Sequence, residues 1–333
     1  MSNKSRMIRR MVKASCNSEM ILLVTNKRDV TTDFVVRELD ARDIPFVRLN
    51  TEDIASGEVI FDLATGGWVV QVDDQTLALD AVTGAYYRRP VAPLVDTDPD
   101  DAAIAPYREG EWSAVLKSIW NELEGRWFNS PFAIMRAEDK PRQLKTAIKL
   151  GFKVPETILT NNLDRAVAFR AERSCIGKPL RHALLDDAIG PGRVIFTNTI
   201  PLLNEDDRDA ISLAPVILQS EIPKTCDIRV TVVGDRVFAT RIGSQETADT
   251  KTDWRKGSNP ALSHSSLVLE ANTAERCRVL TRELGLGFGA IDLVEDVNGQ
   301  LWFLEINPNG QWAWIETRTG APISAAIVDV LCA

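Results

Sequence analysis

Histidine is nearly absent from this sequence of 333 residues, which contains only His182 and His264. There is therefore little basis for a histidine-rich zinc site. The cysteines are odd in number, dispersed and without C-x-x-C spacing, at Cys16, Cys175, Cys226, Cys277 and Cys332. This usage is typical of reduced thiols, so we expect a cytoplasmic protein. No Ser-His-Asp or Cys-His pattern in the sequence indicates a covalent protein nucleophile.

Long apolar runs and an excess of positive charge are also missing. No run approaches the roughly 20 apolar residues that span a bilayer, so we expect no membrane association. The net charge of −8 argues against a non-specific nucleic-acid surface. Residues 1–17 are basic but have no apolar core, so they are not a signal peptide. We interpret them as a disordered extension, with a mobile arm that contacts a partner as the alternative.

The segment FGAIDLVEDVNGQLWFLEINPN, residues 288–309, organises the rest of the chain. Two apolar runs flank Asn298-Gly299, a strong hairpin signal because both residues tolerate positive φ. With a two-residue loop, Asp292 lies directly opposite Glu305. Cross-strand partners have Cβ atoms roughly 5 Å apart, so these carboxylates repel each other unless a cation lies between them.

Asn307 follows Glu305 by two residues, so it extends the same face of the hairpin. An Asp, a Glu and an Asn oxygen together suit Mg²⁺ that is bridged to phosphates. The alternative is a solvated sheet edge with unrelated acids. The opposite face is expected to be buried core and carries Ile291, Leu293, Leu304 and Ile306.

Strand and helix signals alternate before this hairpin. Residues 20–25, 33–40 and 45–49 predict strand, helix and strand, which together form a βαβ unit. The turn-forming residues at 129–131 interrupt the predicted helices and strands, which indicates a domain boundary near residue 132. We therefore expect an α/β protein with three regions, at 18–131, 132–217 and 218–333.

Several basic residues stand where they can meet phosphate or carboxylate groups. Lys178 ends a predicted strand before Pro179, and a lysine held there reaches a phosphate as a point charge. Arg229 and Arg255 have the guanidinium geometry that clamps phosphate oxygens. Each of these residues, like Lys140, is also compatible with an ordinary surface charge or salt bridge. The Arg88-Arg89 pair, beside two tyrosines, is either an anion grip or a set of edge-strand charges.

The order of these motifs resembles the ATP-grasp ligases, from Lys140 to the acid triad Asp292, Glu305 and Asn307. The finer pattern is similar to the peptide-modifying branch that makes microviridin-type graspetides. It consists of YYRRP at 86–90, DKPRQLKTAIKLGFKVPET at 139–157, DWR at 253–255, EINPNGQWAWIE at 305–316 and TGAPI at 319–323. The likeness covers roughly residues 20 to 330. It implies an ATP-grasp fold with an N-terminal βαβ pre-ATP-grasp domain and two ATP-clasping subdomains.

The resemblance also implies a role for each matching residue. Lys140 and Lys178 would hold the α- and β-phosphates of ATP, and Asp227 its ribose. The hinge Gln219, Ser220, Glu221 and Ile222 would meet adenine through its backbone, although Ser220 replaces the usual Glu. Arg229 and Arg255 would act at the γ-phosphate and the acyl phosphate, and Asp292, Glu305 and Asn307 would bind Mg²⁺.

The activity implied is an ATP-dependent carboxylate–amine or carboxylate–alcohol ligase that forms macrocycles in a ribosomal precursor peptide. Asp or Glu side chains of the peptide would become acyl phosphates and be joined to Ser or Thr as esters or to Lys as amides. The alternatives are a ligase that adds free amino acids and a non-catalytic peptide-binding protein. The precursor sequence, the ring number and the choice of ester or amide stay open.

The resemblance suggests that the leader of the precursor docks on the middle region. The candidate surface is the hairpin at 184–200 with the helix at 204–213, whose acids include Asp186, Asp187, Asp206 and Asp207. The other interpretation is a solvated acidic helix face. We further expect a homodimer with no nucleic-acid or membrane partner.

Overall fold

The computed structural model describes residues 19–98, 101, 103–180, 184–185, 193–194, 197–255 and 262–333. The extension predicted at 1–17 and the two acids Asp186 and Asp187 lie outside these residues. In the described part of the chain, no helix combines the length and apolar character needed to cross a bilayer.

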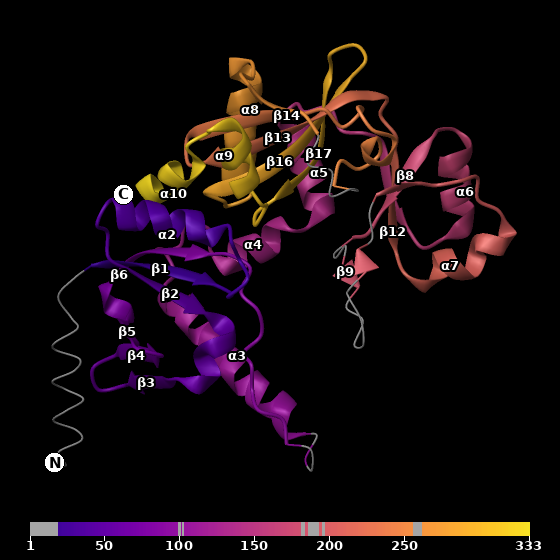
Figure 1. Ribbon diagram of the computed structural model, residues 1–333. Coiled ribbons are helices and arrows are strands. Elements are labelled where there is room, and N and C mark those ends of the chain that lie inside the picture. The colour runs from indigo at the N-terminus through magenta and orange to yellow at the C-terminus, as the bar shows by residue number, and fades with distance from the viewer. Residues whose placement is uncertain are drawn as a thin grey trace, which may run out of the picture.

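The N-terminal region contains the predicted βαβ unit. The parallel sheet has the order β2-β1-β6, with β1 in the centre, and α2 connects its first two strands (Figure 1). A small antiparallel sheet, β3-β4-β5, lies next to it. The bounds are β1 Met20–Thr25, α2 Thr32–Ala41, β2 Phe46–Asn50, η1 Thr51–Ser56, β3 Glu58–Asp62, β4 Gly67–Val72, β5 Gln75–Ala78, η2 Leu79–Ala81, β6 Val82–Tyr87 and α3 Ile104–Glu122.

The middle of the chain forms a four-stranded antiparallel sheet of order β11-β8-β12-β7. A short hairpin, β9 with β10, pairs Leu184 with Val194, as the sequence predicted for this segment. The bounds are α4 Pro131–Ala137, α5 Lys140–Lys149, β7 Thr157–Thr160, α6 Leu163–Ala171, β8 Cys175–Lys178, β9 Leu184–Leu185, β10 Arg193–Val194, β11 Asn198–Thr199, η3 Glu205–Asp207, α7 Arg208–Leu213 and β12 Val216–Ser220.

The C-terminal region is a five-stranded antiparallel sheet of order β15-β14-β13-β16-β17. A turn at Gly234-Asp235 joins β13 to β14 and has positive φ at Gly234. The bounds are β13 Lys224–Val233, β14 Arg236–Ile242, η4 Ala248–Thr250, β15 His264–Leu267, α8 Ala271–Glu283, β16 Phe288–Asp296, β17 Leu301–Asn307, α9 Ala313–Thr319 and α10 Ile323–Leu331.

Two apolar cores tie these elements together. One lies on one face of the five-stranded sheet, where residues such as Ile228 and Ile291 pack with α8, α4 and α5. The other joins the N-terminal region to the C-terminal helices, since Ile21 and Val35 share a core with Trp312 and Ile327. Helix α2 accordingly lies against α10 (Figure 1). The middle sheet has a smaller core of its own, built around Phe169 and Leu218.

The hairpin β16–β17 differs from its prediction in the turn. The loop has three residues, 297–299, instead of two, and Asp296 donates its amide to Gln300 O at 3.0 Å. The Asp296 carboxylate accepts hydrogen bonds from Asn298 N, Gln300 N and Trp302 Nε1, which stabilises this longer loop. Gly299 takes the left-handed conformation, with φ of 77°.

A bulge in β17 cancels the one-residue shift in pairing that the longer loop causes. The register shifts by one residue between Leu293 and Asp292, because Leu304 is an extra, bulged residue of β17. Phe303 therefore occupies the buried core position that was predicted for Leu304, which is only half-buried. Beyond the bulge, Asp292 lies directly opposite Glu305, as predicted.

Candidate active site

Arg229 lies beside Asp292 on the neighbouring strand β13. Strand β13 pairs with β16 so that Arg229 lies directly opposite Asp292. The Arg229 Nε to Asp292 Oδ1 distance is 2.9 Å, and both side chains are buried, with 6% and 8% of their surface exposed. Burial raises the pKa of Asp292, although the charges of Arg229 and Arg255 oppose this shift. The site is thus built on three adjacent strands of one rigid sheet.

Arg255 lies against both carboxylates. Its Nη2 is 3.4 Å from Glu305 Oε1 and 4.0 Å from Asp292 Oδ2. Asp253 holds the guanidinium, because its Oδ1 accepts hydrogen bonds from the backbone N and the Nε of Arg255, each at 3.1 Å. Burial tends to lower the pKa of Arg255, but the carboxylates of Asp292, Glu305 and Asp253 outweigh it, so the pKa is raised. The predicted need for a cation between the two acids is therefore met by a side chain of the protein.

Two lysines also lie near Glu305. Lys140, the first residue of α5, places its Nζ 3.5 Å from Glu305 Oε2 and donates to Pro179 O at 3.1 Å. Lys178 ends β8, and burial lowers its pKa. Although burial of Glu305 acts in the opposite direction, Lys140, Arg255 and Lys178 lower the pKa of this carboxyl to about 2.

We expect this depressed pKa to appear in the acid stability of the protein. Between about pH 4.5 and pH 2 the unfolded chain binds more protons at Glu305 than the folded chain, so stability falls as the pH falls. The stabilisation present at neutral pH is about 3 kcal/mol, at 1.36 kcal/mol per pKa unit. Urea unfolding of the wild type and Glu305→Gln at neutral and acid pH measures it. The difference between the two proteins should shrink on acidification, and a difference independent of pH would contradict the assignment.

The predicted adenine hinge lies at the end of β12. Ser220 N donates to Glu156 O and Glu221 N donates to Ser174 O, so these two amides are already occupied. The Ile222 amide is not bonded to any residue that the structure describes and is the free donor of this segment. The Gln219 side chain accepts a hydrogen bond from Lys178 Nζ at 2.9 Å, a contact that orients the lysine and was not foreseen.

Asp227 lies two residues before Arg229 on β13. Its Oδ2 is 2.7 Å from Lys224 Nζ, in a pair that is nearly buried. Asp227, Arg229 and Asp292 therefore lie on one face of the sheet, as the alternation along the strands requires.

The donor set fits a hard divalent cation. Asp292 Oδ2 is buried and has no hydrogen-bond partner among the described residues. Among the described residues, the Glu305 carboxylate pairs only with Lys140 and Arg255. Asn307 Oδ1 accepts one bond, from Asn309 N, which leaves a second lone pair. Carboxylate and amide oxygens are ligands that Mg²⁺ accepts. In the described residues no group of three or more His, Cys, Asp and Glu side chains is arranged to hold a metal ion, so the amide of Asn307 is needed to complete a protein ligand set.

Several residues that hold this site were missed by the sequence reasoning. Gln143, on α5, donates to Ile306 O and accepts from Ile306 N, which fixes β17 next to Glu305. Asn129 bonds the backbone at Gly287, Phe288 and Pro308. A single buried Gln or Asn carries no recognisable spacing, and its partners lie more than 150 residues away in the chain.

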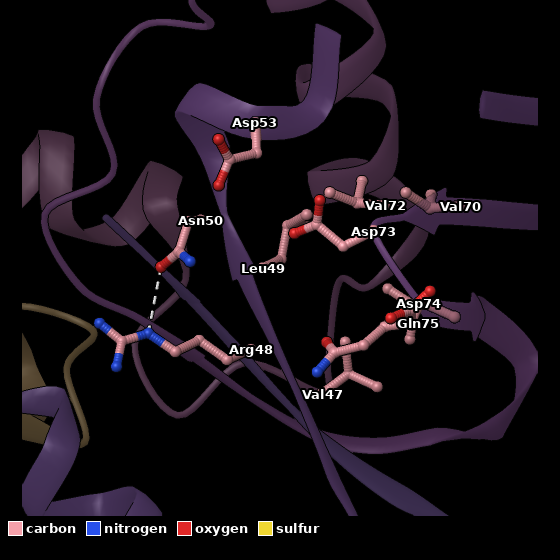
Figure 2. Close-up of a pocket in the computed structure, with 11 residues that line it drawn as sticks. Val47, Arg48, Leu49, Asn50, Asp53, Val70, Val72, Asp73, Asp74 and Gln75 are labelled. Carbon is pink, nitrogen blue, oxygen red and sulfur yellow. Dashed lines mark hydrogen bonds between the residues drawn. The ribbon is translucent and has the colours of Figure 1, made fainter. Parts of the chain in front are cut away.

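A hollow of about 320 Å³ lies elsewhere, in the N-terminal region between β2 and the β4–β5 hairpin (Figure 2). Its arginine, Arg48, donates one hydrogen bond from each guanidinium nitrogen, to Asn50 Oδ1, Asp33 Oδ1 and Asn26 O. None of the residues predicted for ATP, metal or catalysis lines this hollow. The charge set around Glu305, rather than this hollow, is therefore the candidate active site.

Comparison with known proteins gives the family. A model described as a RimK-like ATP-grasp domain matches residues 137–331, more than half of the chain. A curated relative, the probable alpha-L-glutamate ligase of Haemophilus influenzae, is 26% identical over 247 residues, which cover 70% of this chain and 77% of the relative. The range matched by the family model, 137–331, includes every residue of the predicted ATP and metal sites.

Two solved structures resemble the chain over nearly its whole length. One is a RiPP-associated ATP-grasp ligase of Chryseobacterium gregarium in complex with ADP and a leader and core peptide. It has a TM-score of 0.84 and 27% identity, over 94% of this chain and 96% of that chain. The other is the macrocyclase MdnC of Microcystis aeruginosa bound with the precursor peptide MdnA, with a TM-score of 0.80 and 26% identity, over 94% and 99%.

These matches confirm two predictions from the sequence, the ATP-grasp fold and the resemblance to the ligases of ribosomal peptide maturation. The fold, the ligase relatives and the family model agree on one kind of chemistry. The chain belongs to the RimK-like ATP-grasp family and is an ATP-dependent ligase.

Proposed function

We propose that this ligase closes rings within a ribosomally made precursor peptide. It joins an Asp or Glu side chain to Ser or Thr as an ester, or to Lys as an amide. The observation that carries the proposal is the likeness, over 94% of the chain, to two ligases that were solved with their peptides. This likeness extends through the N-terminal region, which the family model at 137–331 does not reach.

The charge layout supports the chemistry. A carboxylate is a poor acyl donor at neutral pH, and phosphoryl transfer from ATP gives it a good leaving group. We assign Asp292, Glu305 and Asn307 to Mg²⁺, which when bound neutralises charge on the phosphate oxygens. Lys140 and Lys178 are the proposed contacts of the α- and β-phosphates, and both are close enough to the acid site to lower the pKa of Glu305.

The remaining polar residues complete the assignment. Arg229 and Arg255 stabilise the transferring phosphoryl group and the acyl phosphate, since both guanidinium groups lie at the acids. The free Ile222 amide is the proposed adenine contact within the Gln219–Ile222 hinge, and Asp227 the ribose contact. A hydroxyl or amine of the peptide then attacks the acyl phosphate, so that no covalent protein nucleophile is required.

Mass spectrometry tests the proposal directly. Small peptides encoded beside this gene are co-expressed with the ligase and then weighed. Each ring closure removes one water from the peptide and forms one ADP and one phosphate. A peptide that stays at its full mass while ATP is consumed in its presence would contradict ring closure. Hydrolysis of the product at mild alkaline pH separates esters, which open, from amides, which do not.

A second candidate is a ligase that adds free amino acids to a peptide or small acid. It is favoured by the curated relatives, which are probable alpha-L-glutamate ligases. The same mass measurement decides, because ligation adds one amino-acid residue to the product instead of removing water.

The expected homodimer and cytoplasmic setting are further parts of the proposal, and light scattering of the purified protein tests the dimer.

We further propose that the peptide leader docks on the middle sheet, along the β9–β10 hairpin and α7. Asn204 caps η3, which leads into α7, and the Asp207 carboxylate completes the cap by accepting from Asn204 N at 2.9 Å. Asp207 is therefore occupied by the protein itself. Asp206 and Asp209 are exposed and are the acids of this turn that remain available to a basic leader.

Charge reversal at Asp206 and Asp209 should weaken leader binding. The double substitution Asp206→Lys with Asp209→Lys leaves the cap intact while replacing attraction for a basic leader by repulsion. Leader affinity, measured by fluorescence anisotropy, should fall and its salt dependence should flatten, because the screened attraction has been removed. ATP affinity is the internal control and should not change. Unaltered leader binding would place the docking surface elsewhere.

A further inference from the structure

Arg88 carries a buried charge that the proposed chemistry does not use. It directly follows β6, and only 1% of its surface is exposed. Its Nε lies 3.0 Å from Asp29 Oδ2, so the anion that it binds belongs to the protein itself. Asp29 Oδ2 also accepts hydrogen bonds from Thr25 Oγ1 at 3.1 Å and from Thr32 Oγ1 at 2.7 Å. The N-terminal region therefore fixes one edge of the Arg88 guanidinium.

The same guanidinium reaches the turn at 308–310, which directly follows Asn307. Arg88 Nη1 donates to Asn309 O at 3.2 Å and to Gly310 O at 3.1 Å. Hydrogen bonds from a charged donor are stronger than those between neutral groups. One charge from the N-terminal region thus holds two successive carbonyls of this turn.

The turn in its turn binds Asn307, the proposed third ligand of Mg²⁺. Asn309 N donates to Asn307 Oδ1 at 2.9 Å, and Gly310 N donates to Asn307 O at 3.3 Å. The two residues whose carbonyls are bonded to Arg88 are therefore the two whose amides are bonded to Asn307. A shift of this turn changes the direction of the Asn307 side-chain oxygen.

The turn also lies against Arg229. Gly310 is buried, and a Cβ atom there would lie 3.1 Å from Arg229 Nη1 and 2.3 Å from the Cβ of Ala290. Ala290 is the β16 residue directly opposite Asn307. The turn therefore folds back over the end of the hairpin without spare room, and its position affects Asn307 and Arg229 together.

We propose that Arg88 is a positioning residue for Mg²⁺, because it holds the turn at 308–310 so that Asn307 Oδ1 stays directed at the metal. This inference rests on the metal assignment made under the proposed function and adds a residue from the N-terminal region. Arg88 acts through the turn, since its ion pair is with Asp29 and its hydrogen bonds are to the turn's carbonyls. Replacing a residue that supports a metal ligand typically lowers metal affinity about tenfold to a hundredfold.

The substitution Arg88→Lys tests this role. Lysine keeps a positive charge beside Asp29, but its single nitrogen cannot take the places of both Nε and Nη1. The readout is the factor by which Mg²⁺ strengthens ADP binding, measured by calorimetry with and without Mg²⁺. We expect this factor to fall about tenfold to a hundredfold. ADP affinity in the absence of Mg²⁺ should not change, because Arg88 acts on a metal ligand alone.

Two further variants keep the test decisive if Arg88→Lys does not fold. Asp29→Asn combined with Arg88→Met removes both charges of the buried pair, so that no buried charge is left without a partner. Gly310→Ala displaces the turn from its other side, because the added Cβ atom overlaps Ala290. Both should weaken the effect of Mg²⁺ on ADP binding as Arg88→Lys does.

The matched control is Arg42→Met. Arg42 also connects the N-terminal region to the C-terminal helices, since it donates to Asp329 Oδ1 at 2.6 Å and to Ala325 O at 3.3 Å, but its partners lie outside the turn. Its melting temperature reports the loss of such a connection alone, and its Mg²⁺ effect should equal that of the wild type.

An unchanged Mg²⁺ effect in the folded Arg88 variants would overturn the proposal, even where the melting temperature falls. Wild-type ADP binding that is independent of Mg²⁺ would overturn the metal assignment and this inference together. The measurement contains no peptide, so it does not depend on ring closure. A wild type that leaves the precursor at its full mass would therefore contradict the ring-closure function alone.

Discussion

The substitution Glu305→Gln is expected to abolish ligation while the protein still folds. Glu305 is the carboxylate at which Lys140, Lys178 and Arg255 meet, and it is a proposed ligand of Mg²⁺. Loss of metal-assisted charge stabilisation costs several kcal/mol in the transition state, which corresponds to a fall on the order of a thousandfold in rate. ADP formation and product mass, measured side by side with the wild type, give the result.

A control on the same hairpin sharpens this test. Glu295 lies on β16, the other strand of this hairpin, but it pairs with Arg241 at 2.7 Å and is not part of the charge set around Glu305. Glu295→Gln should therefore ligate at nearly the wild-type rate. Ligation by Glu305→Gln at that rate would refute the metal assignment. So would an unchanged dependence of the melting temperature on Mg²⁺ and ADP.

The apo protein should also lose stability in Glu305→Gln. Two facing carboxylates alone would suggest the reverse, because removal of a like-charge pair relieves repulsion. Arg255, however, contacts both acids, and Lys140 contacts Glu305. The acids are thus outnumbered by cations, and replacing one of them leaves positive charges that repel one another.

The second large effect is expected at the buried pair Arg229 and Asp292. Breaking such a pair from one side leaves an uncompensated buried charge and costs about 3 to 5 kcal/mol. We therefore expect Arg229→Leu and Asp292→Leu each to lower the free energy of unfolding by this amount, as measured in urea. The double variant should regain most of the loss, because leucines on neighbouring strands replace the pair without a stranded charge.

Ligation behaves differently from stability in this cycle. Neither single variant nor the double variant should ligate, since both side chains belong to the proposed site. Recovery of stability without recovery of activity would separate the structural role of the pair from its chemical role. A double variant as unstable as the sum of the two single variants would show that the pair is not an independent buried unit. Ligation by any of the three would contradict the site.

Much of the site could be predicted because its geometry is local. Asp292 and Glu305 lie on one hairpin, and alternation along two strands determines which side chains share a face. Even so, their pairing was predicted from a loop that is one residue too short. A bulge at Leu304 restores the register, and the Asp296 carboxylate stabilises the longer turn. Neither feature has a signal in the spacing of apolar residues.

Contacts between distant segments could not be predicted in this way. The positions of Lys140, Lys178 and Arg255 around Glu305 followed from resemblance to a family, since no periodicity connects them. Supports such as Gln143, which bonds β17, were missed. Arg88 was noted as part of an arginine pair, but its bond to the loop after Asn307 was not foreseen. A buried polar side chain looks the same in the sequence whether its partner lies four residues away or two hundred.

Two large cores pack most of the molecule into one body. The N-terminal region shares a core with the five-stranded sheet, and α4 and α5 pack against the same sheet. The middle sheet has only its own small core. Lys178 and Gln219 come from the middle sheet, whereas Asp292 and Glu305 come from the five-stranded sheet. Lys140 connects the two parts, because its Nζ donates to Pro179 O and lies 3.5 Å from Glu305 Oε2. The positive charge around Glu305 therefore depends on how the middle sheet sits against the rest of the molecule.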